Sequence, residues 1–445
     1  MKTSWPGLIG LLAALTLLSA CGVSSSNEDA SGGSSPVEPP TDGTGARPSP
    51  SPGSSDSAGP PMGDVSAPSQ GSGTTPLPGQ LTAGDWDDNL NFTFFQQYLA
   101  QPPGLPTYPS ADRVLLTVRD ADGQPIPNAR VTIQGSAGTR LEAPTATDGR
   151  LVFLPTQEGA QPGEHFTVRV VPPVGSPVTT AVEGQDWTVT LLGAEAVLPS
   201  ELDVAFVVDT TGSMGDELNY LKAEVEGLVD AVHASHPGVS ARFALVLYRD
   251  QGDAYVVRSY DFTADGGTFR KWLAAQSADG GGDLPEAMEK GLEAIHQLTW
   301  RTGNAARLTF LVADAPSHPE NHEKFLAEAR RARLAGIKLY PVAASGVTDA
   351  AEYQLRLAAQ LTLGRYIFLT DDSGIGNSHA LPHIPCYQVQ LLSKVLARAI
   401  GSELQGRRLP ASGTDVVRTV GNPNQEGACT QSDGSVTHLG SRPGG

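Results

Sequence analysis

The chain is short of cationic side chains, and this deficit narrows the partners it can have. Lys and Arg number 30 among 445 residues, against 48 Asp and Glu, which gives a formal net charge of −18. A nucleic-acid partner is disfavoured, because binding to phosphates requires a cationic surface. The carboxylate excess instead suits the binding of cations, which take oxygen ligands.

Long apolar runs are also scarce. The run from Leu8 to Leu18 comes after Lys2, and no other segment is apolar enough to span a membrane. At about 1.5 Å per residue, this run is too short to cross a ~30 Å hydrocarbon core as a helix. It is typical of the core of a signal peptide, so we expect residues 1–20 to be a signal peptide.

Cysteine is rare, and the first of the three comes directly after that run. Leu18-Ser19-Ala20-Cys21 resembles the bacterial lipobox. The resemblance implies that Cys21 is acylated and becomes the mature N-terminus of an envelope lipoprotein. Acyl chains on one cysteine meet the requirement for stable membrane attachment. Gly22 comes next in place of Asp, which by resemblance favours the outer membrane. The alternative is a plain secretory signal with an incidental cysteine.

Residues 21–80 have hardly any aromatic or branched side chains. Ser, Pro, Gly and Asp dominate this segment. It cannot bury enough apolar area to offset its ordering entropy, so we predict a disordered tether. Its prolines favour extended conformations.

Residues 81–199 are predicted to form a β module. Leu81 to Tyr108 supplies a dense apolar cluster that should pack on the strands after it, and Arg113 to Leu192 shows period-two runs separated by turn signals. This pattern predicts an antiparallel β-sandwich. The segments 120–129 and 147–150 resemble the carboxypeptidase regulatory-like (transthyretin-like) module, which implies a spacer or adhesion role.

From residue 200 to 405 the pattern alternates between strand and helix, which predicts an α/β domain with a doubly wound, mostly parallel sheet. The expected strands are 204–208, 243–248, 255–262, 308–313, 338–342 and 365–369. The expected helices are 218–232, 286–298, 320–335, 350–363 and 387–404. In such a sheet, ligands bind beyond the carboxyl ends of the strands.

Oxygen-bearing residues come directly after two of these strands. Asp209-Thr210-Thr211-Gly212-Ser213 stands after the first strand, and Asp314 ends the strand at 308–313. A carboxylate and two hydroxyls on alternate residues offer hard oxygen donors to one point, as Mg²⁺ or Ca²⁺ requires. Each residue alone could equally be a helix cap.

This constellation resembles the metal-ion-dependent adhesion site of von Willebrand factor type A domains. The resemblance implies one Mg²⁺ or Ca²⁺ bound by Asp209, Thr211, Ser213 and Asp314. Many members place a metal-binding Thr in the glycine-rich loop, where this chain has Asp283 in Gly280-Gly281-Gly282-Asp283. A third carboxylate would raise the affinity for the cation and reduce the need for an acidic partner group.

The function implied is that of a non-enzymatic adhesion or scaffold protein whose cation holds a protein partner, through a Glu or Asp of that partner. Two alternatives stay open. One is a metal-independent structural spacer of the envelope. The other is an enzyme, because the motif at Asp209 also resembles the phosphorylated loop of ion-pumping ATPases, although position 210 is Thr and not Lys.

The two remaining cysteines, Cys386 and Cys429, form an even pair, which in an oxidising compartment favours a disulfide that pins the tail, residues 406–445. Two free buried thiols are the alternative. A zinc site at His379, His383 and Cys386 is a further possibility for the same loop. For Asp250, after the second strand, we expect an ion pair with a neighbouring Arg.

Overall fold

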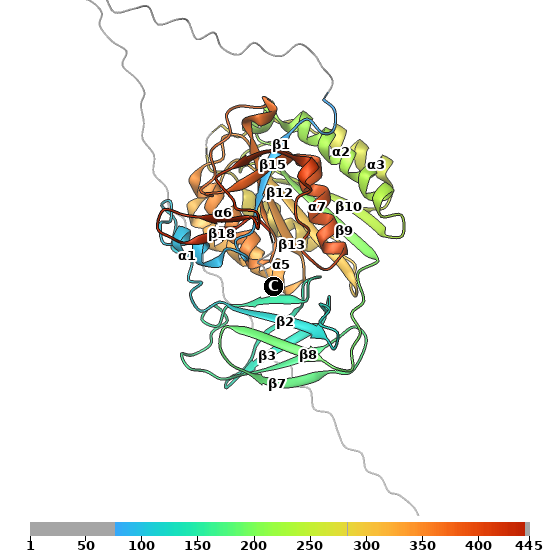
Figure 1. The fold of residues 1–445 in the computed structure, drawn as a ribbon. Coiled ribbons are helices and arrows are strands. Elements are labelled where there is room, and N and C mark those ends of the chain that lie inside the picture. Colours follow the sequence, from blue (N-terminus) through green and yellow to red (C-terminus); the bar gives the residue numbers. More distant parts are fainter. Residues whose placement is uncertain (1–75, 283, 441–445) are drawn as a thin grey trace, which may run out of the picture. The chain divides into compact units, whose positions relative to one another are not determined.

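A computed structural model describes residues 76–282 and 284–440. The predicted signal peptide, Cys21, nearly all of the tether and Asp283 lie outside these residues. Within them, a nine-stranded mixed sheet has the order β11-β10-β9-β12-β13-β14-β1-β15-β16 (Figure 1). None of the described helices is long and apolar enough to cross a membrane.

Five parallel strands form the centre of this sheet. They are β10 (Ser240–Tyr248), β9 (Glu201–Asp209), β12 (Ala305–Ala313), β13 (Lys338–Ala343) and β14 (Tyr366–Thr370). All residues of β12, β13 and β14 are buried. Strands covered on both faces require the near-continuous apolar runs that the sequence shows. The prediction of an α/β fold is therefore confirmed, with a mixed sheet.

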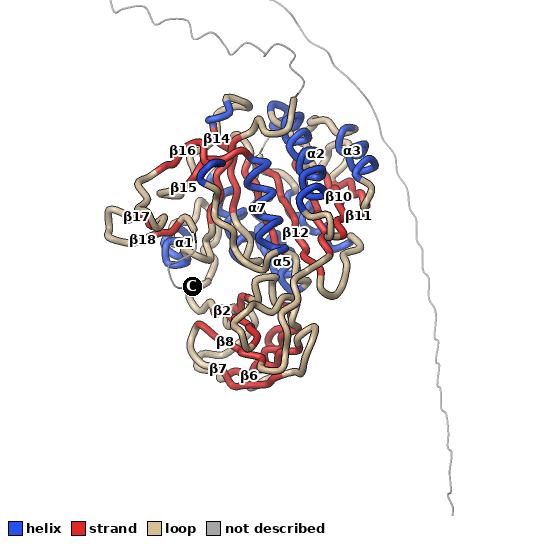
Figure 2. Tube along the Cα trace, turned by 45° about the vertical axis from the view of Figure 1, so that its right-hand side comes forward, coloured by secondary structure: helices blue, strands red, loops and turns tan. Residues whose placement is uncertain are grey.

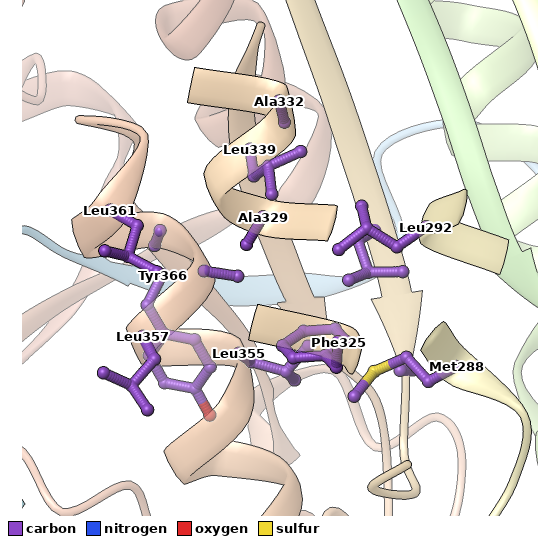
Figure 3. Close-up of a cluster of buried hydrophobic side chains, with 14 of the residues drawn as sticks. Met288, Leu292, Phe325, Ala329, Ala332, Leu339, Leu355, Leu357, Leu361 and Tyr366 are labelled. Atoms are coloured by element: carbon purple, nitrogen blue, oxygen red, sulfur yellow. The ribbon is translucent and has the colours of Figure 1, made fainter. Parts of the chain in front are cut away.

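Helices cover both faces of the sheet. On one face lie α4 (Met288–Ala294), α5 (His322–Leu334) and α6 (Asp349–Leu361), whose buried side chains form one apolar cluster (Figure 3). Val207 of β9 and Leu311 of β12 belong to the same cluster. The other face carries α2 (Leu218–Ser235), α3 (Gly266–Ala274) and α7 (Leu392–Leu404), which pack side by side (Figure 2). Successive strand residues point to opposite faces, so each of the five parallel strands contributes to both clusters.

The strand β1 (Thr82–Trp86) corrects the predicted domain boundary at residue 81. It lies inside the large sheet, antiparallel to β14 and to β15 (Tyr387–Leu391), and not in the β module. Two arginine side chains hold β1 there: Asp85 forms ion pairs with Arg398 at 2.7 Å and with Arg365 at 3.0 Å. Burial alone would raise the pKa of Asp85, but these guanidinium groups lower it below its ordinary value.

The end of the chain needs two further corrections. The helix expected from residue 387 begins only at Leu392, because residues 387–391 form the extended strand β15, which pairs with β1. The predicted tail supplies β16 (Val416–Val420), which pairs with β15, so the tail completes the sheet edge. At the other edge lies β11 (Val257–Thr263), which is antiparallel to β10.

Residues 114–191 form two smaller sheets around one apolar cluster. One has the order β5-β2-β8 and the other β4-β3-β6-β7. The strands are β2 (Val114–Asp120), β3 (Arg130–Gly135), β4 (Gly138–Pro144), β5 (Arg150–Phe153), β6 (Phe166–Val171), β7 (Val178–Val182) and β8 (Asp186–Leu191). The pair β2 and β8 is parallel, so the antiparallel prediction is wrong there. β8 follows β7, which belongs to the other sheet. Because no hairpin joins β8 to β2, nothing in the connection requires the two strands to be antiparallel.

Cys386 and Cys429 are joined by a disulfide. The bond ties β15 to a small hairpin of β17 (Ala428–Thr430) and β18 (Val436–His438). His438 donates its backbone N–H to the side chain of Asn91, at the start of α1 (Phe92–Leu99). Asn91 also donates its side-chain N–H to the carbonyl of His438, so the hairpin is attached both covalently and by hydrogen bonds.

We expect the double substitution of Cys386 and Cys429 by Ala to make the chain sensitive to proteolysis after residue 405, because the hairpin has a small core of its own. Limited trypsin digestion and then mass spectrometry measure this. Equal digestion patterns of the double variant and the wild type would contradict the expectation.

Candidate functional site

The candidate site lies where two neighbouring parallel strands end. Asp209 is the last residue of β9, and Asp314 comes directly after β12. Val208 pairs with Val312, so the two carboxylates lie at the same edge of the sheet. From β9 the chain goes first to β10 on one side and later to β12 on the other. This reversal of strand order is where open α/β sheets place their ligands.

A local hydrogen-bond network shapes the motif after β9. Oδ1 of Asp209 accepts from the backbone N–H of Thr211 at 2.9 Å and from its hydroxyl at 2.7 Å. The Thr211 hydroxyl oxygen lies 3.2 Å from that of Ser213. The hydroxyl of Thr210 is not part of this network and donates to the backbone carbonyl of Tyr248. Alternate residues therefore bring one carboxylate and two hydroxyls together, as the spacing predicts.

Both carboxylates of the site are buried and only partly satisfied. Asp209 is 0% exposed and Asp314 is 4% exposed. Among the described residues, Oδ2 of Asp209 and Oδ1 of Asp314 have no hydrogen-bond partner. An ionised oxygen withdrawn from water without a partner is costly, so this pair of oxygens calls for a proton or a cation.

The electrostatics agree with that conclusion. Burial, and after it the charge of Asp314, raises the pKa of Asp209 to about 7, against the hydrogen bonds from Thr211. Burial also raises the pKa of Asp314, and the hydrogen bond with Ser213 opposes this. The two acids repel each other across the site, as like charges in a shared site do.

A third buried carboxyl group, that of Glu286, lies near the motif and was not predicted as a site residue. It is 2% exposed, and its Oε2 has no hydrogen-bond partner in the described part of the chain. Burial, then Asp209, Asp250 and Asp314, raise its pKa to about 8. One signal in the sequence could have pointed to Glu286: it ends the glycine-rich loop that contains Asp283. The sequence of that loop does not show in which direction the Glu286 side chain points.

The glycine-rich loop is held against the motif. Gly212 donates its N–H to the carbonyl of Gly280, and Gly281 donates to Asp253. Gly281 has a φ of +66°, and a Cβ there would lie 2.9 Å from Oε1 of Glu286 and 3.1 Å from Cβ of Thr211. Only glycine permits this conformation and this close approach.

Asp283 lies outside the described residues, so its predicted role has no structural account. No group of three or more His, Cys, Asp or Glu in the described part of the chain is arranged to hold a metal ion. The site instead mixes carboxylate and hydroxyl oxygens. Such a donor set fits a hard cation, Mg²⁺ or Ca²⁺, and the unpartnered buried oxygens agree with one.

The other candidate ligands have different partners. Asp250 pairs with His318 at 2.7 Å, and not with an Arg as expected, because Arg249 binds the carbonyl of Ser277 instead. His379 lies between Glu217 and Asp371, and His383 pairs with Glu352. Since Cys386 is in the disulfide, it offers no thiolate to a zinc site with these histidines.

The comparisons with known proteins place a family over this part of the chain. The family described as "von Willebrand factor A domain" matches residues 203–340, which run from the third residue of β9 to the middle of β13 and include Asp209 and Asp314. The chain is 29% identical over 147 residues to the alpha-protein kinase vwkA of Dictyostelium discoideum, covering 33% of this chain and 23% of that protein.

A second relative is the human von Willebrand factor A domain-containing protein 7, which is 37% identical over 90 residues, or 20% of this chain and 10% of that protein. The matches therefore span less than a quarter of each relative. Among solved structures, the BatB protein of Bacteroides thetaiotaomicron aligns with 46% of this chain and 98% of its own, at 14% identity and a TM-score of 0.33. Agreement at that level has no bearing on function.

Proposed function

Starting from a von Willebrand factor A domain at residues 203–340, we propose that this protein binds one divalent cation at the ends of β9 and β12 and uses it to hold a protein partner. Asp209, Thr211, Ser213 and Asp314 would hold the cation, with Asp283 as a further candidate. The cation would supply a Lewis-acidic point of attachment for an oxygen of the partner, such as a Glu or Asp carboxylate.

One observation carries the proposal. Two buried carboxylate oxygens without partners among the described residues, one on Asp209 and one on Asp314, lie at the strand-order reversal beside two hydroxyls. A structural role as helix caps would leave these oxygens hydrogen bonded to backbone N–H groups. Oδ1 of Asp209 accepts from the backbone N–H of Thr211 in that way, whereas the two oxygens named above have no partner among the described residues. Ser213 is exposed, so the cation would face solvent on one side.

Binding of a partner should then require the cation. We expect partner retention on the immobilised protein in Mg²⁺ or Ca²⁺ and its loss in EDTA, with recovery when the cation is returned. Pull-down of envelope proteins with quantitative mass spectrometry measures this. A partner retained equally in EDTA would instead favour the metal-independent spacer.

The catalytic alternative has less support from the site. A nucleophilic carboxylate must reach its substrate, whereas Asp209 is fully buried and its Oδ1 is occupied by Thr211. One relative is named a kinase, but its match covers 23% of that protein. Turnover of acetyl phosphate that depends on Asp209 would support the enzymatic alternative.

We also propose that the protein is a lipoprotein of the bacterial envelope, anchored through Cys21 to the outer membrane, with residues 114–191 as a carboxypeptidase regulatory-like spacer beside the cation-binding domain. We expect Cys21→Ser to move the protein from the membrane fraction to the soluble fraction, because the acyl chains supply the anchor. Incorporation of labelled palmitate into the wild type alone checks this. Label in the variant would contradict it.

A further inference from the structure

A small cavity lies at the N-terminal ends of β13 and β14, at the sheet edge opposite to the candidate cation site. Lys338 is the first residue of β13, and Arg365 comes directly before β14. Both line the cavity, together with Arg150 of β5 and Arg408, which follows α7. These residues belong to one compact unit of the chain. The cavity is therefore built jointly by residues 114–191 and the α/β domain.

A cluster of charged side chains surrounds this cavity, and its charges do not balance. The cations of the cluster are Arg150, Lys338, Arg365, Arg398 and Arg408. Its acids are Asp85, Asp87, Asp148 and Glu403. The most exposed of these side chains is only 27% exposed. Five cations face four acids, so one largely buried positive charge has no acid of its own within residues 76–282 and 284–440.

The ion pairs inside the cluster leave two N–H donors unused beside the cavity. Asp85 is shared between two arginines, Arg398 at 2.7 Å and Arg365 at 3.0 Å. Nη1 of Arg365 makes no hydrogen bond with it, and Nε of Arg408 has no hydrogen-bond partner among the described residues. A buried donor on a charged group is costly to leave without an acceptor. Both arginines line the cavity, so the missing acceptor belongs there.

The surroundings of these two arginines supply no further negative charge. The strongest charge effects on Arg365 and Arg408 come from members of the cluster and from Tyr340. Tyr340 stays protonated, because burial and then the charge of Glu403 raise its pKa well above the ordinary value. Burial lowers the pKa of Arg408; Asp87 opposes this, and the charge of Arg365 lowers the pKa further. The two guanidinium groups thus repel each other, and an anion between them would remove that repulsion.

The size of the cavity restricts the anion. Its volume is about 20 Å³, whereas about 10–15 Å³ suffices for one water molecule. A particle close to water in size fits, and an anion of several atoms such as phosphate does not. Water would accept the N–H bonds but leave the charge uncompensated, while chloride does both. Arg407, which is exposed, lines the rim of the cavity, so an ion can enter from solvent.

We propose that this cavity binds one chloride ion, which accepts from Nη1 of Arg365 and Nε of Arg408. The ion balances the charge of the cluster. Lys338 on β13 lies 3.5 Å from Asp148 of the β module, so the cluster crosses between the two parts of the chain. Bound chloride therefore stabilises the contact between residues 114–191 and the α/β domain. The anion site is independent of the proposed cation site at the opposite sheet edge.

Thermal melting of the full chain in sodium chloride and in sodium gluconate, at equal ionic strength and with EDTA in both, tests the anion site. EDTA removes divalent cations, and gluconate is too large for the cavity. A ligand that binds only the folded state raises Tm. Ordinary salt effects act on every variant alike, so the comparison between variants isolates the site. We expect the change in Tm from gluconate to chloride to be about 2–4 °C more positive in the wild type than in Arg365→Gln.

Arg365→Gln removes the excess charge and one of the two donors, while Asp85 keeps Arg398 as its partner. If this variant does not fold, Arg398→Gln removes the same excess while Asp85 keeps Arg365. Arg333→Gln is the matched control. Arg333 is 5% exposed and also has an unpartnered Nε among the described residues, but it pairs with Glu158 and does not line the cavity. We expect this variant to keep the response of the wild type to chloride.

Crystals grown in bromide locate the ion directly, because bromide replaces chloride and scatters anomalously. We expect an anomalous peak within hydrogen-bond distance of Nη1 of Arg365 and Nε of Arg408. A cavity without such a peak overturns the anion site. An equal response to chloride in the wild type and in the folded variant without the excess charge also overturns it. So does an equal loss of response in Arg333→Gln, since a general effect of buried arginines then accounts for the result.

Discussion

Replacing Asp209 with Asn will reduce the affinity for Mg²⁺ and Ca²⁺ by about 100-fold or more, while the metal-free protein melts at a higher temperature than the wild type. Loss of residues that only support metal ligands costs 10- to 100-fold, so loss of a charged ligand should reach at least the upper end. The stabilisation has a separate cause: Asp209 is fully buried beside Asp314, and an amide removes their repulsion.

Isothermal titration with each cation and differential scanning calorimetry without cations measure the two effects. Asp261→Asn is a suitable control, because Asp261 is an exposed acid that binds Thr299 far from the motif in sequence. A melting temperature that falls together with the affinity would show that Asp209 is needed mainly for folding, contrary to the expectation.

Replacing Arg356 with Leu will lower the free energy of unfolding by about 3–5 kcal/mol, the usual cost of removing one partner of a buried ion pair. Arg356 is 0% exposed on α6 and binds Asp88 at 2.7 Å and Glu352 at 3.1 Å. Its guanidinium also lies 3.9 Å from the ring centroid of Tyr98. The variant leaves two acids buried without this cation.

Chemical denaturation at neutral pH measures this loss. It should be smaller in mild acid, because burial raises the pKa of Asp88 and its protonation removes the uncompensated charge. Arg270→Leu is the control: that Arg pairs with Asp230 at the surface, where such a pair contributes under about 1 kcal/mol. Similar losses in the two variants would mean that burial of the ion pair adds nothing.

The parallel centre of the sheet and the motif at its edge could be predicted because both are local in sequence. Continuous apolar runs identify strands that are buried on both faces, and a carboxylate directly after such a run is placed at the ligand-binding edge. The helical period at Leu218, Val225 and Val232 likewise identified the buried face of α2. Each of these signals lies within a short stretch of chain.

Long-range pairings could not be predicted in this way. Thr82 pairs with Thr370, and nothing in residues 82–86 indicates which sheet they will join. The prediction of an Arg partner for Asp250 was wrong for the same reason. Its partner is His318, which lies after a different strand and is distant in sequence. The direction of the Glu286 side chain depends on the loop conformation at Gly281, and the sequence does not specify it.

The position of β1 affects how the domain would carry mechanical load. Tension applied from the N-terminal side of the described chain enters the large sheet through β1, which is hydrogen bonded to β14 on one side and to β15 on the other. Pulling along this strand shears both ladders at once and cannot peel an edge strand. The buried contacts of Asp85 with Arg398 and Arg365 oppose the same sliding movement. A domain built in this way resists extraction at the point where the pull arrives.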